Sequence, residues 1–253
     1  MKESDGGLLL TEVHGPIMIM TLNRPSKKNA INRVLAAEIA AALRRLDCDS
    51  TLLAGVLTGN GHSFCSGMDL RDFQDRGTPQ DLQDVLRISL TKPMVAAVEG
   101  FAVAGGFELA LRCDLIVAAR GSKVGLPEVK VGQIAGFGIR QLLQELPRQA
   151  VAELALTGEF MSAERAYELG LVTRLVDPGQ ALPTALELAG AMIRNAPLSL
   201  AASLSLLNIG STEREKDYYE VADQHAQITS HSHDALEGAA AFTERRDANW
   251  EGR

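Results

Sequence analysis

Short apolar runs alternate with helix-like segments through the first 130 residues, and this alternation limits the possible folds more than any other feature. The runs "LLAGVLTGNG", "KPMVAAVEG" and "LIVAARG" are each nearly continuous in apolar residues and stop at glycine. Such runs are typical of strands buried on both faces of a sheet. The segments "TPQDLQDVLRISLT" and "AGGFELALRCD", which lie between them, have helical spacing. Strands that alternate with helices predict an α/β fold with crossover connections.

The two ends of the chain extend this pattern differently. Near the N-terminus, "LLLTEVHGPIMIMTLNRP" predicts a hairpin, and "NRVLAAEIAAALRRLDCD" predicts a helix with Asn32 as its N-cap. "SKVGLPEVKVG" predicts a loop that carries Glu128. After residue 138 most segments look helical, including the run from about Glu213 to Asn249, and only "LVTRLVD" predicts extended structure. We therefore expect an α/β core followed by a helical part, whose tail packs on its own core or on a neighbouring subunit.

The net charge limits which binding partners the protein can have, and the cysteine content indicates its cellular compartment. The 253-residue chain has a net charge of −7, which argues against a nucleic-acid binder, although its 25 Lys and Arg residues can still bind a small anion. Its three cysteines include no CxxC pair, so a zinc site or a disulfide framework is not expected, and free thiols suit a reducing cytoplasm. We find no signal-peptide core and no apolar run long enough to span a bilayer, and so expect a cytoplasmic protein without membrane contact.

A glycine pair stands where a predicted strand meets a predicted helix. Gly105 and Gly106 precede the helix-like segment, and the first N–H groups of a helix have no internal partners. The loop "CSGMDL" enters a second helix in the same way. Two such N–H groups directed at one carbonyl oxygen would form an oxyanion hole. The alternative for either glycine stretch is a tight turn or close packing of helix on strand.

Two glutamates are the candidate acid–base pair. Glu108 lies in an otherwise apolar run, where a carboxylate has a high desolvation cost, and Glu128 lies in the predicted loop. Carboxyl groups in a partly dry pocket have raised pKa values that suit proton transfer near neutral pH. The alternatives are an ion pair between Glu108 and Arg112, four residues later, and a solvated Glu128. These residues alone do not choose between the readings.

Six segments in order resemble one family. They are "LNRPSKKNAIN", "SFCSGMDL", "KPMVAAVEGFAVAGGFELALRCDLIVAA", "GLPEVKVG", "ALTGEFMSAERAYELGLVTRLV" and "EGAAAFTERRDANWEGR". Together they resemble the crotonase superfamily, also called the enoyl-CoA hydratase/isomerase family, over nearly the whole chain. The resemblance implies an α/β fold, the ClpP-like spiral of ββα units, in residues 1–195. It also implies a helical trimerisation region in residues 196–253, with a homotrimer or a hexamer made of two trimers.

The resemblance further implies a substrate and a reaction. The substrate would be an acyl-coenzyme A thioester whose carbonyl oxygen lies between the N–H groups of Met68 and Gly105. Coenzyme A would be carried as part of the substrate, with no separate cofactor and no metal. Glu108 would deprotonate a water molecule, Glu128 would deliver a proton to the α-carbon, and the backbone of Gly136 would help place the water. The reaction would be the hydration of a trans-2-enoyl-CoA to a 3-hydroxyacyl-CoA in fatty acid metabolism.

The same resemblance suggests where coenzyme A binds, and leaves alternatives open. The implied contacts are Arg24, Ser66, Asp69, Leu70 and Arg71. The stretch "VKVGQIAGFGIRQL" lacks the family's usual Pro-Gly-Ala-Gly-Gly run, so the preferred acyl group stays open. The alternatives are an enoyl-CoA isomerase, an enzyme like carnitinyl-CoA dehydratase, and a non-catalytic acyl-CoA binder.

Overall fold

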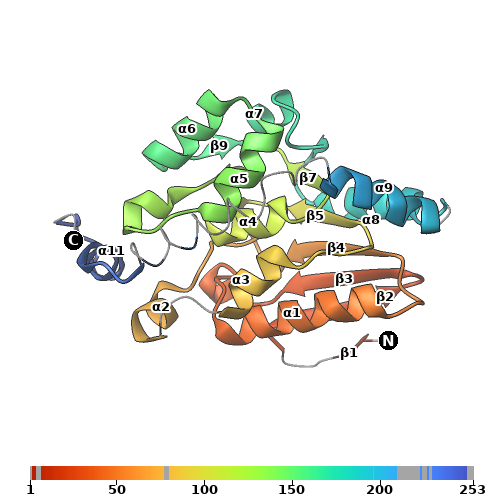
Figure 1. Cartoon of the computed structure of the whole chain (residues 1–253), viewed down its shortest axis with the longest axis horizontal. Coiled ribbons are helices and arrows are strands. Elements are labelled where there is room, and N and C mark those ends of the chain that lie inside the picture. The colour runs from red at the N-terminus through yellow and green to blue at the C-terminus, as the bar shows by residue number, and fades with distance from the viewer. Residues whose placement is uncertain are drawn as a thin grey trace.

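The computed structural model describes residues 2–3, 7–76, 80–195, 197–209, 223, 227 and 230–249. Two sheets and a set of helices make up this part of the chain (Figure 1). The strands are β1 (Lys2–Glu3), β2 (Leu9–His14), β3 (Ile17–Leu22), β4 (Ala54–Gly59), β5 (Met94–Val98), β6 (Phe101–Val103), β7 (Leu115–Ala119), β8 (Lys123–Gly125), β9 (Met161–Ser162) and β10 (Arg174–Val176). The α-helices are α1 (Arg33–Cys48), α2 (Leu70–Arg76), α3 (Gln80–Arg87), α4 (Gly105–Leu111), α5 (Gly136–Glu145), α6 (Arg148–Thr157), α7 (Ala163–Glu168), α8 (Ala181–Met192), α9 (Pro197–Ile209) and α11 (His233–Glu244), with short 3-10 helices η1 (Pro25–Lys27) and η2 (Pro127–Val131).

The larger sheet has seven strands in the order β1-β2-β3-β4-β5-β7-β10. β2 and β3 form the predicted antiparallel hairpin, and the pairs from β3 to β10 are parallel. Helices α1 and α8 lie on its two faces. Successive residues of a strand point to opposite faces of the sheet. Met18 and Met20 of β3 join the core that holds α1, whereas Ile17 joins the core that holds α8. Burial on both faces explains why these strands are continuous in apolar residues.

Helix α1 begins where the sequence predicts. The side chain of Asn32 accepts a hydrogen bond from the backbone N–H of Leu35 at 3.0 Å, as an N-cap does. The prediction of a largely helical C-terminal part is confirmed for the described residues, and "LVTRLVD" contains β10, but the prediction misses the short strand β9. Much of the run expected to be helical from about Glu213 lies outside the described residues, as does Ala196 at the predicted domain boundary. The division of the chain at residue 195 stays a prediction.

The smaller sheet corrects the sequence analysis. β6, β8 and β9 form three strands in that order, with β6 parallel to β8. The stretch "SKVGLPEVKVG" is therefore a strand followed by a 3-10 helix, not a loop. Strands of two or three residues are too short to carry a periodic signal, and their partners come from distant parts of the chain. This sheet matters because β6 leads to Gly105 and β8 leads to Glu128.

Helix α11 packs at the opposite end of the molecule from α8 and α9 (Figure 1). It contacts α2 and η2, and its Ala235 and Ala239 join Phe73 in a small apolar cluster. Helix α11 lies close to the backbone after η2: a Cβ on Gly132 would lie 2.7 Å from the carbonyl oxygen of Asp234. Part of the C-terminal region thus forms one wall of the site that follows.

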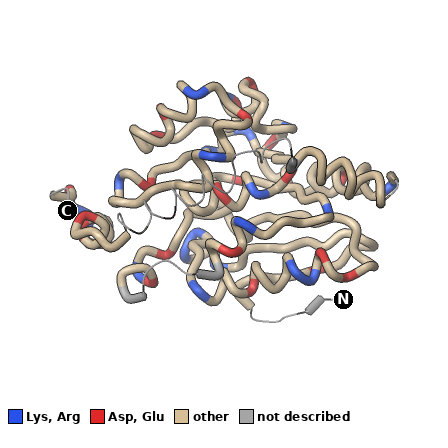
Figure 2. The backbone as a smooth tube through the Cα atoms, in the orientation of Figure 1, with Lys and Arg blue, Asp and Glu red and all other residues tan. Residues whose placement is uncertain are grey.

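Charged residues of both signs are interspersed along the chain in Figure 2. In the described part of the chain, no helix is both long and apolar enough to cross a membrane.

Candidate active site

Two backbone amides lie side by side where the predicted oxyanion loops meet. Gly67 has a φ of +90°, which favours glycine, and Ala104 adopts a φ of +52° despite its side chain. A Cβ on Gly67 would lie 2.6 Å from the Cβ of Ala104 and 3.3 Å from the amide nitrogen of Gly105. A Cβ on Gly105 would lie 3.8 Å from the amide nitrogen of Met68. The structure thus brings the amides of Met68 and Gly105 together.

Both amides are available to a ligand. Ile31 donates to the carbonyl of Gly67 and accepts from the N–H of Asp69. Because successive N–H groups of an extended chain face opposite sides, the N–H of Met68 faces away from Ile31. The N–H of Gly105 stands at the first position of α4. Within the described residues, neither N–H donates to a protein acceptor.

The second glycine of the pair has a packing role. A Cβ on Gly106 would lie 2.5 Å from the carbonyl oxygen of Cys65, which belongs to the first oxyanion loop. That loop runs beside β6: Cys65 donates to the carbonyl of Phe101, and its own carbonyl accepts from Val103. Gly105 therefore leaves the ligand side open, whereas Gly106 lets the two loops touch.

Glu108 is buried in α4 and accepts a hydrogen bond at 2.8 Å from the backbone N–H of Gly138, the third residue of α5. Burial raises the pKa of Glu108 to about 7, and the Gly138 hydrogen bond opposes that rise. The side chain of Arg112, the alternative partner, donates instead to the carbonyl of Ile88. Glu108 is thus held by a backbone amide.

Glu128 is buried in η2, and its Oε2 has no hydrogen-bond partner in the described residues. Burial raises the pKa of Glu128 well above its ordinary value, and the charge of Glu108 raises it further. The reading of Glu128 as a solvated loop residue is therefore wrong. Because burial raises the pKa of both carboxyl groups and the charge of Glu108 acts on Glu128, the two groups titrate as a pair.

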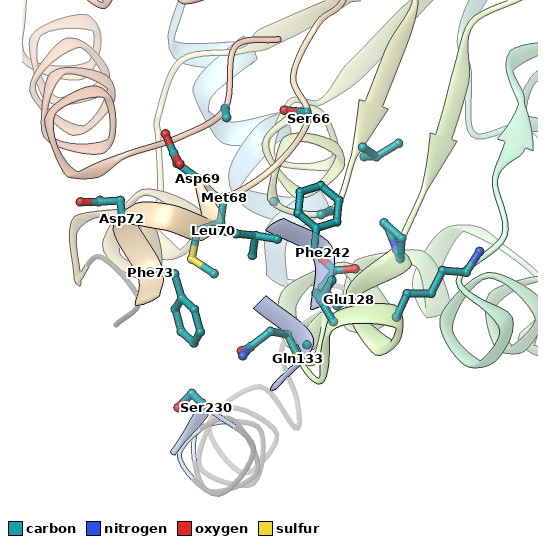
Figure 3. Close-up of a pocket in the computed structure, with 18 of the residues that line it drawn as sticks. Ser66, Met68, Asp69, Leu70, Asp72, Phe73, Glu128, Gln133, Ser230 and Phe242 are labelled. Carbon is teal, nitrogen blue, oxygen red and sulfur yellow. The ribbon is translucent and has the colours of Figure 1, made fainter. Parts of the chain in front are cut away.

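One pocket contains most of the residues predicted for the site. It is lined by both glutamates and both oxyanion residues, and also by Gly136, Ser66, Asp69, Leu70 and Arg71. Figure 3 shows Ser66, Met68, Asp69, Leu70 and Glu128 around this space, with Phe242 of α11 among them.

Arg24 has a different position from the others. Its guanidinium pairs with the carboxylate of Asp69 at 3.0 Å and donates to the carbonyl of Ala30, and it is not among the described residues that line the pocket. Arg24 therefore joins Ala30 to Asp69, the residue that follows Met68. A direct contact of Arg24 with coenzyme A stays a prediction.

Several lining residues were not found from the sequence. Lys27 and Lys28 line the pocket, and the ammonium of Lys28 lies 5.7 Å from the ring centroid of Phe101. Their signal was the cationic pair in "LNRPSKKNAIN". Gly138 had no signal of its own, because its partner Glu108 is thirty residues away.

The geometry agrees with the comparisons to known proteins. The family model described as enoyl-CoA hydratase/isomerase matches residues 12–253. The chain is 36% identical to mevalonyl-coenzyme A hydratase sidH of Aspergillus fumigatus over 245 residues, covering 92% of this chain and 91% of that protein. It is 34% identical to the solved structure of a carnitinyl-CoA hydratase from Mycobacterium avium, with a TM-score of 0.90, covering 98% of this chain and all 100% of that one. It is 42% identical to the solved structure of an enoyl-CoA hydratase from Mycobacterium tuberculosis, with a TM-score of 0.77, covering 97% and 99% of the two chains.

These matches confirm the predicted family and fold class. The chain belongs to the enoyl-CoA hydratase/isomerase family, within the crotonase superfamily.

Proposed function

We propose that the protein hydrates a trans-2-enoyl-CoA to the 3-hydroxyacyl-CoA. The observation that carries this proposal is the pair of buried glutamates beside two adjacent backbone amides in one pocket. The names of relatives support the reaction class, because those quoted above are hydratases of CoA thioesters.

The proposed steps use this chain's own groups. The thioester oxygen accepts hydrogen bonds from the N–H groups of Met68 and Gly105, which stabilise the negative charge that develops there. Ionised Glu108 takes a proton from water as the water oxygen bonds to C3. Protonated Glu128 gives its proton to C2. A proton then passes from Glu108 to Glu128, directly or through a water molecule, which restores both groups, so one water molecule is added in total. The reverse reaction is a dehydration by the same groups.

The proposal needs no separate cofactor, since coenzyme A arrives with the substrate. Cations that line the pocket suit the phosphates of coenzyme A: Lys27 and Lys28 join the predicted contact Arg71. We also propose a homotrimer or hexamer in the cytoplasm, and the free state of the three cysteines supports this compartment.

Replacing each glutamate with glutamine tests the proposal. We expect Glu108→Gln and Glu128→Gln each to lower kcat for crotonyl-CoA by about 10²- to 10⁴-fold, because each loses a proton-transfer group. Turnover is followed by the ultraviolet absorbance of the enoyl thioester, and binding of acyl-CoA by calorimetry. Binding is expected to remain, and Glu145→Gln, an exposed glutamate of α5, serves as the matched control. A wild-type protein that turns over 3-enoyl-CoA alone would be an isomerase, and one that binds without any turnover would be an acyl-CoA binder.

A second candidate is hydration or dehydration of a functionalised acyl-CoA. Two relatives named above act, by their names, on mevalonyl-CoA and carnitinyl-CoA. Product analysis with these two thioesters beside crotonyl-CoA separates this candidate from a hydratase of unsubstituted chains.

A further inference from the structure

Gln133 carries an amide that the described protein leaves without a partner. It lines the pocket, and its Nε2 is fully buried with no hydrogen-bond partner in the described residues. A buried amide without a hydrogen bond is costly, and buried polar groups in folded proteins are normally paired. Because Gln133 also lines the pocket, a rotation of its side chain would let a group held in the pocket supply the missing partner.

The backbone ties Gln133 to the turn that carries Glu128. Its N–H donates to the carbonyl of Glu128 at 3.0 Å, so the position of Gln133 is tied to the turn that carries the catalytic acid. In the view of Figure 3, Gln133 extends into the pocket between Phe73 and Glu128, and it lies on the other side of Glu128 from Ser66. Ser66 is on the side predicted for coenzyme A. Gln133 is thus placed for the acyl chain.

Apolar side chains form part of the pocket wall. Phe73 and Met68 belong to one apolar cluster, and Leu82 and Leu86 also line the pocket. A hydrogen-bonding group beside apolar walls favours a ligand that carries a matching group at that place. A carboxylate on the acyl chain would be repelled by ionised Glu108, whereas a hydroxyl is neutral. A hydroxyl both donates and accepts, so it fits either orientation of the amide.

We propose that Gln133 is a specificity residue that binds a hydroxyl group on the acyl chain beyond C3. This inference rests on the proposed hydration of an enoyl-CoA and names the class of acyl group. A site that pairs a buried polar group with a substrate hydroxyl discriminates strongly against the analogue that lacks it, because the polar group is then left unpaired.

Matched pairs of substrates test the preference. 5-Hydroxypent-2-enoyl-CoA and hex-2-enoyl-CoA differ by a hydroxyl in place of a methyl group, and pairs one carbon shorter and longer scan the position. We expect the wild-type enzyme to prefer the hydroxyl member of at least one pair by about tenfold or more in kcat/KM. No preference in any pair would overturn the inference.

The variant Gln133→Met assigns the preference to this side chain. It keeps the length of the side chain and removes the amide, so the ratio of kcat/KM within the preferred pair is expected to fall by about tenfold. Gln180→Met makes the same change at an exposed position before α8 and is expected to leave the ratio unchanged. Thermal melts check that both variants fold. Equal losses on both members of the pair in Gln133→Met would overturn the inference.

Binding separates this inference from the proposed reaction. Calorimetry with 5-hydroxypentanoyl-CoA and hexanoyl-CoA, and with the saturated forms of the other pairs, measures the preference without turnover. Hydration of the alkyl substrates with equal binding within every saturated pair would overturn the role of Gln133 and leave the hydratase intact. Absence of hydration with tighter binding of a hydroxyl compound, lost in Gln133→Met, would overturn the proposed reaction and support Gln133 as the selecting residue.

Discussion

At the residue scale, the two buried carboxyl groups make stability depend on pH. The pKa of Glu108 is about 7 in the folded chain against 4.5 for the free side chain. The folded protein therefore keeps a proton that the unfolded chain releases between these values, and stability falls as pH rises through this window. Glu128 adds a change of the same sign.

We expect Glu108→Gln to be more stable than wild type at high pH. Glutamine keeps an oxygen that can accept from the N–H of Gly138 but carries no charge to desolvate. Its advantage in free energy of unfolding is expected to grow by about 3 kcal/mol at most as pH rises from about 4.5 to about 8. Urea denaturation across this range measures the difference, and Glu145→Gln should show no such trend. A difference between Glu108→Gln and wild type that is constant with pH would contradict the prediction.

Gly67 offers a second test at the residue scale, because a side chain at this position would move the loop that carries Met68. Gly67→Ala places a Cβ in a left-handed conformation and against Ala104, so the oxyanion loop must shift. We expect kcat to fall by about 10²-fold or more through displacement of the Met68 amide. Gly170→Ala is the matched control: its φ of +89° is nearly the same, and nothing lies within 4 Å of the added Cβ. If both variants lose stability alone and keep kcat, the Met68 amide is not part of the site.

The sequence pointed to candidate site residues more readily than to the hydrogen bonds that those residues make. Glu108 stands out because a carboxyl group is rare in an apolar run, whereas the role predicted for Glu128 came from the family resemblance. Gly138 and Gln133 do not stand out, because the bond of the first and the missing bond of the second arise only when distant segments meet.

At the element scale, strong local patterns gave reliable predictions. The hairpin of β2 and β3 and the capped helix α1 each carry their own turn or cap residue. The strands β6, β8 and β9 do not, since their stability comes from pairing between segments far apart in the chain. The smaller sheet was missed for this reason.

Helix α8 offers a test at this scale. The carboxylate of Glu99 accepts hydrogen bonds from Gly179 at 3.0 Å and Ala181 at 3.1 Å, at the N-terminus of α8. A carboxylate there pairs with the open N–H groups and the positive end of the helix dipole. We expect Glu99→Ala to lower the free energy of unfolding by about 1 kcal/mol with kcat unchanged. Chemical denaturation and the hydration assay check this, with exposed Glu187→Ala as control; equal effects of the two variants would rule out a cap.

At the scale of the whole molecule, α9 presents large apolar side chains that the described part of the chain leaves exposed. Leu198, Leu206 and Leu207 are 87%, 69% and 74% exposed. Large exposed apolar groups on one helix mark a surface that another protein covers. The predicted trimer would supply such a cover from a second copy.

We expect light scattering after size exclusion to give the mass of a trimer or a hexamer. Leu207→Glu, which places a charge on this surface, should shift the protein toward smaller species. Glu187→Ala again leaves the surface of α9 unaltered and should keep the wild-type mass. A wild-type protein that elutes as a monomer at all concentrations would contradict the expectation.

The pairing of β6 with β8 has a consequence for how such an enzyme can change over time. These neighbouring strands deliver the amide of Gly105 and the carboxyl of Glu128 to the same place. Every amino acid except proline supplies a backbone N–H, whereas the carboxyl depends on one codon. On the proposed function, a mutation at position 128 would therefore give a descendant a different reaction while the means of holding a thioester is inherited intact.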